Sequence, residues 1–180
     1  MTSPARRERF EDVAAQVVEP VRRFLARRTD HATADDVLAD TLLVCWRRVD
    51  EVPDEPLPWV YGVARNCLAN AERGARRQQR VAGRIAAVDP PPPSAPGPGE
   101  DGPDVQAVTD ALDALPAKDA ELLRLWAWEQ LAPAEIAVVL DITANAASIR
   151  LHRAREKLRE ELRKNGVGAG HEETTEGRKP

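Results

Sequence analysis

The side chains best suited to bind nucleic acid gather in one arginine-rich stretch. Between residues 65 and 84 there are six arginines and one acid, and most of the arginines recur at steps of three and four residues. That spacing places them on one face of a helix. A strand of nucleic acid along this face would gain affinity by counterion release. A merely solvated helical face is the alternative. The six residues are Arg65, Arg73, Arg76, Arg77, Arg80 and Arg84.

Two asparagines and two aromatic residues precede this run. Asn66 and Asn70 lie one helical turn apart, and their amides can hydrogen-bond the edge of a base that has left the stack. Trp59 and Tyr61 can stack on such a base. Packing in the core is the alternative for both aromatics. The segment therefore predicts a surface for single-stranded or extruded bases.

A second candidate site lies near the end of the chain. Residues 133–140 and 144–164 form two amphipathic helical patterns joined by the short break 141–143, and the second pattern is the more basic. This order predicts a helix-turn-helix whose second helix enters the major groove of DNA. Hydrogen-bonding side chains come first on this helix and arginines follow: Thr143, Asn145, Ser148, Arg150, Arg153 and Arg155. The alternative is a solvated helix whose arginines pair with later glutamates.

The acids are segregated from these bases. Residues 35–55 hold seven acids against two arginines, although the net charge of the whole chain is only −4. Asp36 and Asp40 lie four residues apart on the polar side of a predicted helix, a like-charge spacing that weakens an isolated helix. A basic partner surface would explain the pair, and so would a simple solvated face. The charge pattern predicts two kinds of partner.

Nothing in the sequence favours an enzyme. The three histidines are scattered, no residues stand at metal-ligand spacing, and no glycine-rich phosphate loop is present, so we expect no catalytic residue, metal or cofactor. Cys45 and Cys67 lie in apolar helical patterns, and this placement predicts buried, unreactive thiols rather than a disulfide. No apolar run is long enough for membrane insertion, and no export signal is visible. We therefore expect a cytoplasmic protein.

The elements that position these residues are predicted to be helices throughout. The all-α fold divides into a domain at residues 1–88, a Pro/Gly-rich flexible linker at 89–104, a second small domain at 105–165 and a disordered tail at 166–180. The linker holds seven prolines and three glycines in 16 residues. It reaches about 50 Å at roughly 3.1 Å per residue. Helices are expected to begin at Thr33, near Pro58 and at Val105, and Trp46, Trp126 and Trp128 are expected in the core.

The order of these parts resembles the extracytoplasmic-function (ECF) sigma factors of the sigma-70 family. In the second domain, the stretch from ALDALPAKDAELLRLWAWEQ to LHRAREKLREEL is similar to the family's region 4. In the first, ADDVLADTLLVCWRRVD is similar to region 2.2, and PLPWVYGVARNCLANAERGARR to regions 2.3 and 2.4. The resemblance covers about residues 10 to 165. It implies a transcription initiation factor with a region 2 helical bundle and a region 4 helix-turn-helix.

The resemblance also implies partners and residue roles. The expected partners are RNA polymerase core, through its beta-prime clamp helices and beta flap, together with promoter DNA and an anti-sigma factor, and the protein is expected at the nucleoid when bound to polymerase. Asp36, Asp40 and Thr41 would dock on polymerase. The residues that would contact the minus 10 element are Trp59, Arg65, Asn66, Asn70, Arg73, Arg76, Arg77 and Arg80. Those that would contact the minus 35 element are Thr143, Asn145, Ser148, Arg150 and Arg153.

Several residues depart from the family's pattern. Ala39 stands where glutamine is common, Gly62 replaces a frequent basic residue, and no lysine precedes Arg150. Fewer cations weaken binding to any DNA sequence, so we expect the isolated chain to hold promoter DNA poorly. Two other functions remain open from sequence alone. These are a DNA-binding regulator without a melting surface, and a helical interaction protein that no longer binds DNA.

Overall fold

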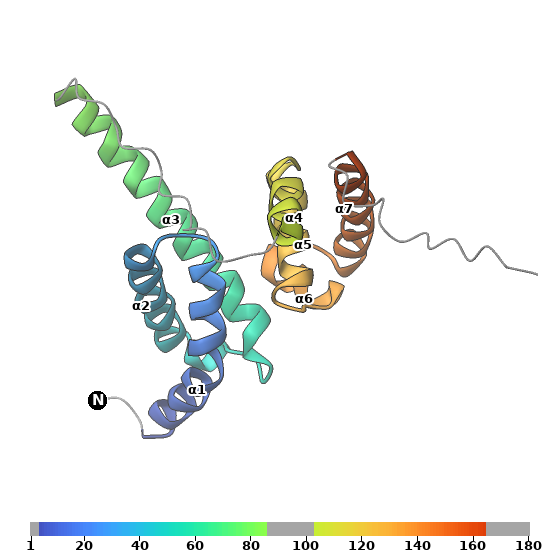
Figure 1. Ribbon diagram of the computed structural model, residues 1–180. Coiled ribbons are helices and arrows are strands. Elements are labelled where there is room, and N and C mark those ends of the chain that lie inside the picture. The colour runs from blue at the N-terminus through green and yellow to red at the C-terminus, as the bar shows by residue number, and fades with distance from the viewer. Residues whose placement is uncertain (1–3, 86–102, 165–180) are drawn as a thin grey trace, which may run out of the picture.

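The computed structural model describes residues 4–85 and 103–164, and this part of the chain is helical with no strand. Figure 1 shows an N-terminal unit (residues 4–85) beside a C-terminal unit (103–164). The first holds α1 (Pro4–Ala26), α2 (His31–Arg47), the 3-10 helix η1 (Val49–Glu51) and α3 (Pro56–Ile85). The second holds α4 (Pro103–Asp113), α5 (Ala117–Ala127), α6 (Pro133–Leu140) and α7 (Ala144–Lys164). The predicted all-α fold is confirmed.

The core of the N-terminal unit forms where α1, α2 and the first half of α3 pack together. Apolar residues at helical spacing supply it, and the fully buried ones include Val17, Val21, Phe24, Val37 and Val60. The second half of α3 extends away from the bundle (Figure 1). Its exposed arginines therefore lie along a helix that is open on most sides.

The start of α2 differs from the sequence prediction. The helix begins at His31 rather than Thr33, because Asp30 is the N-cap: its carboxylate accepts hydrogen bonds from the Thr33 backbone N–H at 3.1 Å and the Thr33 hydroxyl at 2.7 Å. These bonds lower the pKa of Asp30. Aspartate and threonine are both good N-caps. Asp30, the earlier of the two in the chain, is the N-cap, and Thr33 donates hydrogen bonds to it.

The C-terminal unit packs α4, α5 and α6 around α7. Its core is supplied mainly by leucines and by Ile136, with Ala147, Leu151 and Ala154 as the buried stripe of α7. The bounds of α6 and α7 match the prediction. However, α4 begins at Pro103, a position where proline suits the first helical turn, so the last two residues of the predicted linker belong to this helix. The rest of that linker and the predicted tail lie outside the described residues.

The N-terminus of α6 is only half capped. The Glu135 carboxylate accepts a hydrogen bond from the Ala132 N–H at 2.7 Å, but Ala132 itself has no side chain that could bond the first turn. We expect Ala132→Ser to complete the cap and stabilise the chain by about 1 kcal/mol. Thermal unfolding followed by circular dichroism measures the gain. Ala134→Ser, one position beyond Pro133, is the matched control, and an equal gain there would contradict the capping explanation.

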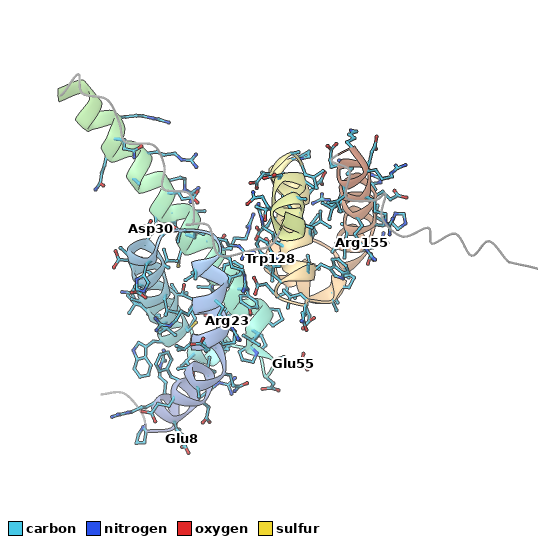
Figure 2. All side chains as sticks on the ribbon, viewed as in Figure 1. Glu8, Arg23, Asp30, Glu55, Trp128 and Arg155 are labelled. Carbon is cyan, nitrogen blue, oxygen red and sulfur yellow. The ribbon has the colours of Figure 1, made fainter. Side chains whose placement is uncertain are left out.

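The two units pack against each other, with α3 lying along α6. The prediction that Trp126 and Trp128 lie in the core is wrong, and this contact helps to explain why. Trp126 and Trp128 are 38% and 37% exposed. Arg155 covers the ring of Trp126 at 4.5 Å, while Arg27 of the N-terminal unit lies 5.8 Å from the ring of Trp128, which is labelled in Figure 2. Arginine stems and cation–π contacts, rather than burial, accommodate these rings.

Candidate nucleic-acid interface

The arginine face predicted from the sequence is present on α3. Arg65, Arg77 and Arg80 are exposed and form no ion pair with any described residue. Arg76 lies 3.4 Å from Glu72, four residues earlier in the helix. Because both side chains are exposed, this ion pair is weak and leaves the Arg76 charge largely available. The face thus keeps several cations available to phosphates. It is long, straight and free of acids apart from Glu72, as a strand-binding surface requires.

The two asparagines of α3 are not equivalent. Arg73 donates a hydrogen bond to the Asn70 side-chain oxygen, so that oxygen is already engaged. Asn66 is exposed, and its amide has no hydrogen bond to any described side chain or backbone group. Both the donor and the acceptor of Asn66 are therefore free to meet a base edge. The structure singles out Asn66 from a pair that sequence spacing treats alike.

The aromatic residues near the start of α3 are less available than expected. Tyr61 is 4% exposed and packs on Phe24 with ring centroids 5.1 Å apart, so of the two alternatives the structure supports core packing for this residue. Burial, with a smaller contribution from the charge of Glu129, raises the pKa of Tyr61 to about 12. Trp59 is half-buried, and Arg48 lies 5.2 Å from its ring centroid. Trp59 therefore keeps only part of its surface exposed.

A left-handed residue forms the turn of the helix-turn-helix. Asp141 caps α6 with φ of 52°, and the Ile142 N–H then donates to the Ala137 carbonyl at 3.0 Å. The Thr143 hydroxyl accepts from the Ala146 N–H at 3.2 Å and caps α7. Thr143 therefore sets the start of the candidate recognition helix as well as lying exposed at its leading end. These contacts fix the angle at which α7 leaves α6.

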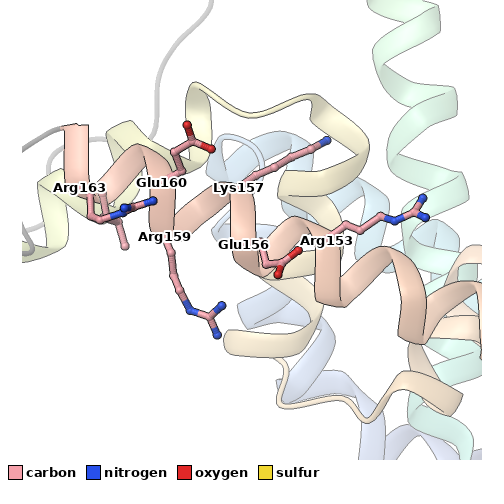
Figure 3. Close-up of a pocket in the computed structure, with 7 residues that line it drawn as sticks. Arg153, Glu156, Lys157, Arg159, Glu160 and Arg163 are labelled. Carbon is pink, nitrogen blue, oxygen red and sulfur yellow. The ribbon is translucent and has the colours of Figure 1, made fainter.

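The cations of α7 divide into two sets. Arg150 and Arg153, near its leading end, are exposed and form no ion pair with any residue in the described ranges. Farther along, Lys157 lies 2.6 Å from Asp119. Figure 3 shows acids interleaved with bases over this second stretch. The solvated-helix explanation fits the far half of α7, whereas the leading half resembles a DNA-binding surface.

The outer face of α2 carries the acidic surface. Asp36 and Asp40 are exposed as predicted, but Thr41 is completely buried and its hydroxyl donates to the Val37 carbonyl at 2.7 Å. Thr41 therefore does not belong to a docking surface. Leu43, which sequence reasoning missed, is 44% exposed and lies three residues after Asp40 on the same side. The sequence signal that could have identified Leu43 is a leucine on the acidic side of this helix.

The cysteines of the described residues are free thiols, Cys45 buried and Cys67 half-buried. No group of three histidine, cysteine or acidic side chains is placed to hold a metal there. Burial raises the pKa of Cys45 to about 11 and also raises the pKa of the half-buried Cys67. Burial thus favours the protonated form of both thiols. No helix in the described ranges has the length and apolarity to cross a bilayer.

These pKa directions predict the reactivity of the thiols. We expect Cys45 of the folded chain to resist iodoacetamide at about pH 8, and Cys67 to react more slowly than free cysteine, because the thiolate is the reactive form. Mass spectrometry of timed samples counts the labels. Denatured chain, in which both thiols should react, is the control. Rapid labelling of Cys45 before unfolding would contradict the predicted burial.

Comparison with known proteins assigns the family. The family model described as "Sigma-70, region 4" matches residues 105–158, which include the helix-turn-helix. The ECF RNA polymerase sigma factor SigL of Mycobacterium tuberculosis is 32% identical over 149 residues, covering 81% of this chain and 84% of SigL. The chain belongs to the ECF sigma factors. RNA polymerase sigma factor CarQ of Myxococcus xanthus is a further relative of this ECF sigma factor, 34% identical over 160 residues and covering 85% and 88% of the two chains.

Solved structures support the fold of this ECF sigma factor. The sigma factor RpoE of Bartonella quintana, solved in complex with the anti-sigma factor NepR, has a TM-score of 0.60 at 22% identity and covers 86% of this chain and 96% of its own. CnrH, solved in complex with the cytosolic domain of CnrY, has a TM-score of 0.56 at 22% identity, over 87% and 88% of the two chains. These structures support the fold of two helical units, and membership of the ECF sigma factors makes the protein a transcription initiation factor.

Proposed function

We propose that this ECF sigma factor binds RNA polymerase core and directs it to promoters, with α3 contacting the minus 10 element and the leading end of α7 the minus 35 element. One observation carries the proposal: each helical unit bears a face on which several exposed arginines form no ion pair with any described residue, Arg65, Arg77 and Arg80 on α3 and Arg150 and Arg153 on α7. Two such faces on one chain suit two separate DNA sites. The protein contributes binding energy to promoter melting and performs no covalent chemistry.

The minus 35 contact divides into positioning and reading. Arg150 and Arg153, three residues apart on one side of α7, meet backbone phosphates, which fixes the register of the helix. Asn145 and Ser148 are exposed at the leading end and can bond base edges. Ile149, 44% exposed between them and the arginines, suits the methyl group of thymine. Sequence reasoning did not single out Ile149.

Polymerase docking is assigned to the outer face of α2. Asp36 and Asp40 supply charge for a basic surface, and Leu43 supplies exposed apolar area between charged rims. This arrangement of an apolar contact with a charged border is typical of protein interfaces. By analogy with RpoE, which was solved with the anti-sigma factor NepR, we also propose that an anti-sigma factor is a partner.

A reconstituted run-off transcription assay with core polymerase tests the proposal. The wild-type chain is expected to yield discrete transcripts from a subset of genomic promoters. The double variant Arg150→Ala/Arg153→Ala should lose minus 35 binding in the holoenzyme and reduce the slope of log affinity against log salt by about 2, one for each lost phosphate contact. Absence of initiation at every promoter would refute the assignment.

Arg159→Ala/Arg163→Ala is the matched control. It removes the same number of cations from the same helix, but from the far half, where Glu156 and Glu160 lie beside them (Figure 3). We expect it to retain minus 35 binding and nearly the wild-type salt slope. If both double variants lost affinity equally, general electrostatic attraction rather than a recognition end would explain the binding of α7.

A further inference from the structure

A pocket of about 560 Å³ lies between the two units and is lined by residues of α3, α5, α6 and α7. Pockets that hold small molecules have volumes of about 300–1,000 Å³, so this one is large enough for such a ligand. Its described lining is mainly basic. The bases are Arg65, Lys118, Arg150, Arg153 and Lys157, and the acids are Asp119 and Glu121. Lys118 and Lys157 belong to none of the DNA or polymerase contacts proposed above.

The two acids leave most of this charge uncompensated. Asp119 accepts a hydrogen bond from Lys157 Nζ at 2.6 Å, so these two charges balance each other. Glu121 faces a different base: its Oε1 atom is buried and lies 3.6 Å from Arg28 Nη2, beyond hydrogen-bond distance. Arg28 also donates to the Glu129 carboxylate at 3.1 Å. The carboxylate of Glu121 therefore offsets a cation outside the pocket lining.

Four bases of the pocket remain without an ion pair to any described residue. They are Arg65, Lys118, Arg150 and Arg153, and all four are exposed. They come from three helices, and Arg65 is the one member of the α3 arginine face among them. Arg153 and Lys157 extend to the same side of α7 (Figure 3). Like charges that converge on one cavity repel each other, and a bound anion would relieve this repulsion.

The first turn of α5 adds hydrogen-bond donors to the same pocket. Ala117 and Lys118 are the first two residues of this 11-residue helix, and both line the pocket. The N-cap residue, Pro116, makes no side-chain hydrogen bond to the turn. The first N–H groups of a helix have no partner within it, and the helix dipole favours an anion at this end. The helix end and the four unpaired bases thus favour the same kind of ligand.

An apolar surface forms another part of the pocket. It consists of Leu122, which is buried, and of Leu140 and Ile142, which are half-buried. An inorganic anion alone would leave this surface in contact with water. A ligand with an organic part beside its charged groups would cover it and gain affinity from the apolar area removed from water. Nucleotides combine a phosphate chain with such an organic part.

We propose that this pocket binds a nucleotide with two or more phosphates. The phosphates meet the first turn of α5 and the four unpaired bases, and the nucleoside lies against Leu140 and Ile142. The site itself is independent of the promoter contacts proposed above. Its consequence rests on them: because Arg150 and Arg153 serve both ligands, a bound nucleotide competes with minus 35 DNA for the free chain.

Isothermal titration calorimetry of the full chain tests the site, with ATP, GTP and inorganic triphosphate as probes and without Mg²⁺. Wild type is expected to bind one ATP or one GTP. Inorganic triphosphate should bind about tenfold more weakly, since covering an apolar area on the order of 60 Å² is worth a factor of this size. Lys118→Glu should weaken ATP binding by about tenfold or more, because it removes a charged contact. An acid in the first turn favours a helix, so the variant should fold, as circular dichroism can verify.

Lys164→Glu is the matched control. It makes the same charge change at an exposed lysine at the end of α7, outside the pocket, so the affinity for ATP should remain that of wild type. Absence of binding of both ATP and GTP to wild type overturns the site, and so do equal losses in the two variants. Inorganic triphosphate that binds as tightly as ATP overturns the assignment to nucleotides.

Displacement of DNA from the free chain tests the competition. Fluorescence anisotropy at low salt follows a labelled duplex that carries the minus 35 element of a promoter identified by run-off transcription. ATP should displace this duplex from wild type. Lys118→Glu should still bind the duplex but need about tenfold more ATP for displacement. ATP that binds wild type without displacing the duplex overturns the competition. A wild-type chain that binds ATP but no promoter duplex, alone or with polymerase, would refute the proposed minus 35 contact and leave the nucleotide site standing.

Discussion

Asn66→Ala is expected to block promoter melting by the reconstituted holoenzyme while leaving its binding to the minus 35 element unchanged. Asn66 is exposed on the arginine face of α3, and its donor and acceptor are both free of described partners. A bidentate hydrogen bond to a base is worth about 1–3 kcal/mol, so its loss should reduce open complex by roughly 5- to 150-fold. Permanganate footprinting of unpaired thymines, alongside filter binding of the closed complex, measures the two steps separately.

Asn70→Ala is the control, one turn farther along the same helix. The Asn70 oxygen is engaged by Arg73, so we expect a smaller loss, arising mainly from the orientation of that arginine. Equal losses in the two variants would contradict a specific base contact at Asn66. Normal melting by the Asn66 variant would favour the rival function, a regulator that binds duplex DNA without opening it.

Phe24→Ala is expected to produce the largest loss of stability. Phe24 is fully buried, contacts the Tyr61 ring at 5.1 Å, and supports the Arg28 guanidinium at 3.7 Å. Truncation of a buried phenylalanine costs about 3–5 kcal/mol. Here it also removes the surface on which the interdomain arginine rests. Urea unfolding monitored by circular dichroism should show the midpoint falling accordingly.

Phe10→Ala provides the comparison on the same helix. Phe10 is half-buried and contacts Trp46 edge-on at 5.2 Å, away from the C-terminal unit. We expect a clearly smaller loss of stability from this change. If Phe24→Ala cost less than about 1 kcal/mol, a value typical of surface sites, the tight packing of α1 on α3 would be contradicted.

Features set by neighbouring residues could be predicted from the sequence. The break at residues 141–143 and the bounds of α6 and α7 follow from turn residues and helical spacing. The exposed arginine faces follow from spacing as well, because side chains three and four residues apart share a side whatever the tertiary structure. For the same reason the difference between the leading half of α7, which has no glutamate, and the far half, where glutamates alternate with bases, could be anticipated from the sequence.

Features set by distant residues could not be predicted. The contact of Arg28 with Glu129 joins residues about a hundred positions apart, and no local pattern encodes it. From sequence alone, Gly62 is only a position where a basic residue is frequent. The structure shows that it faces the backbone of α6, where a Cβ atom would lie 3.4 Å from the Val139 carbonyl oxygen. Thr41 and Thr143 show the same limit: a small hydroxyl can bond its own helix or a partner equally well. Tertiary packing decides between these two kinds of partner: it buries Thr41 and leaves Thr143 exposed.

The α3–α6 interface belongs to a single polypeptide, and this alters how strong it must be. Residues 86–102 join the two units covalently, so each meets the other at an effective concentration of order millimolar whatever the amount of protein in solution. An interface too weak to hold two separate molecules together can therefore dominate within one. A ligand of the surface that α3 and α6 share would compete with this tethered neighbour, and cleavage of the connecting segment would remove the competition.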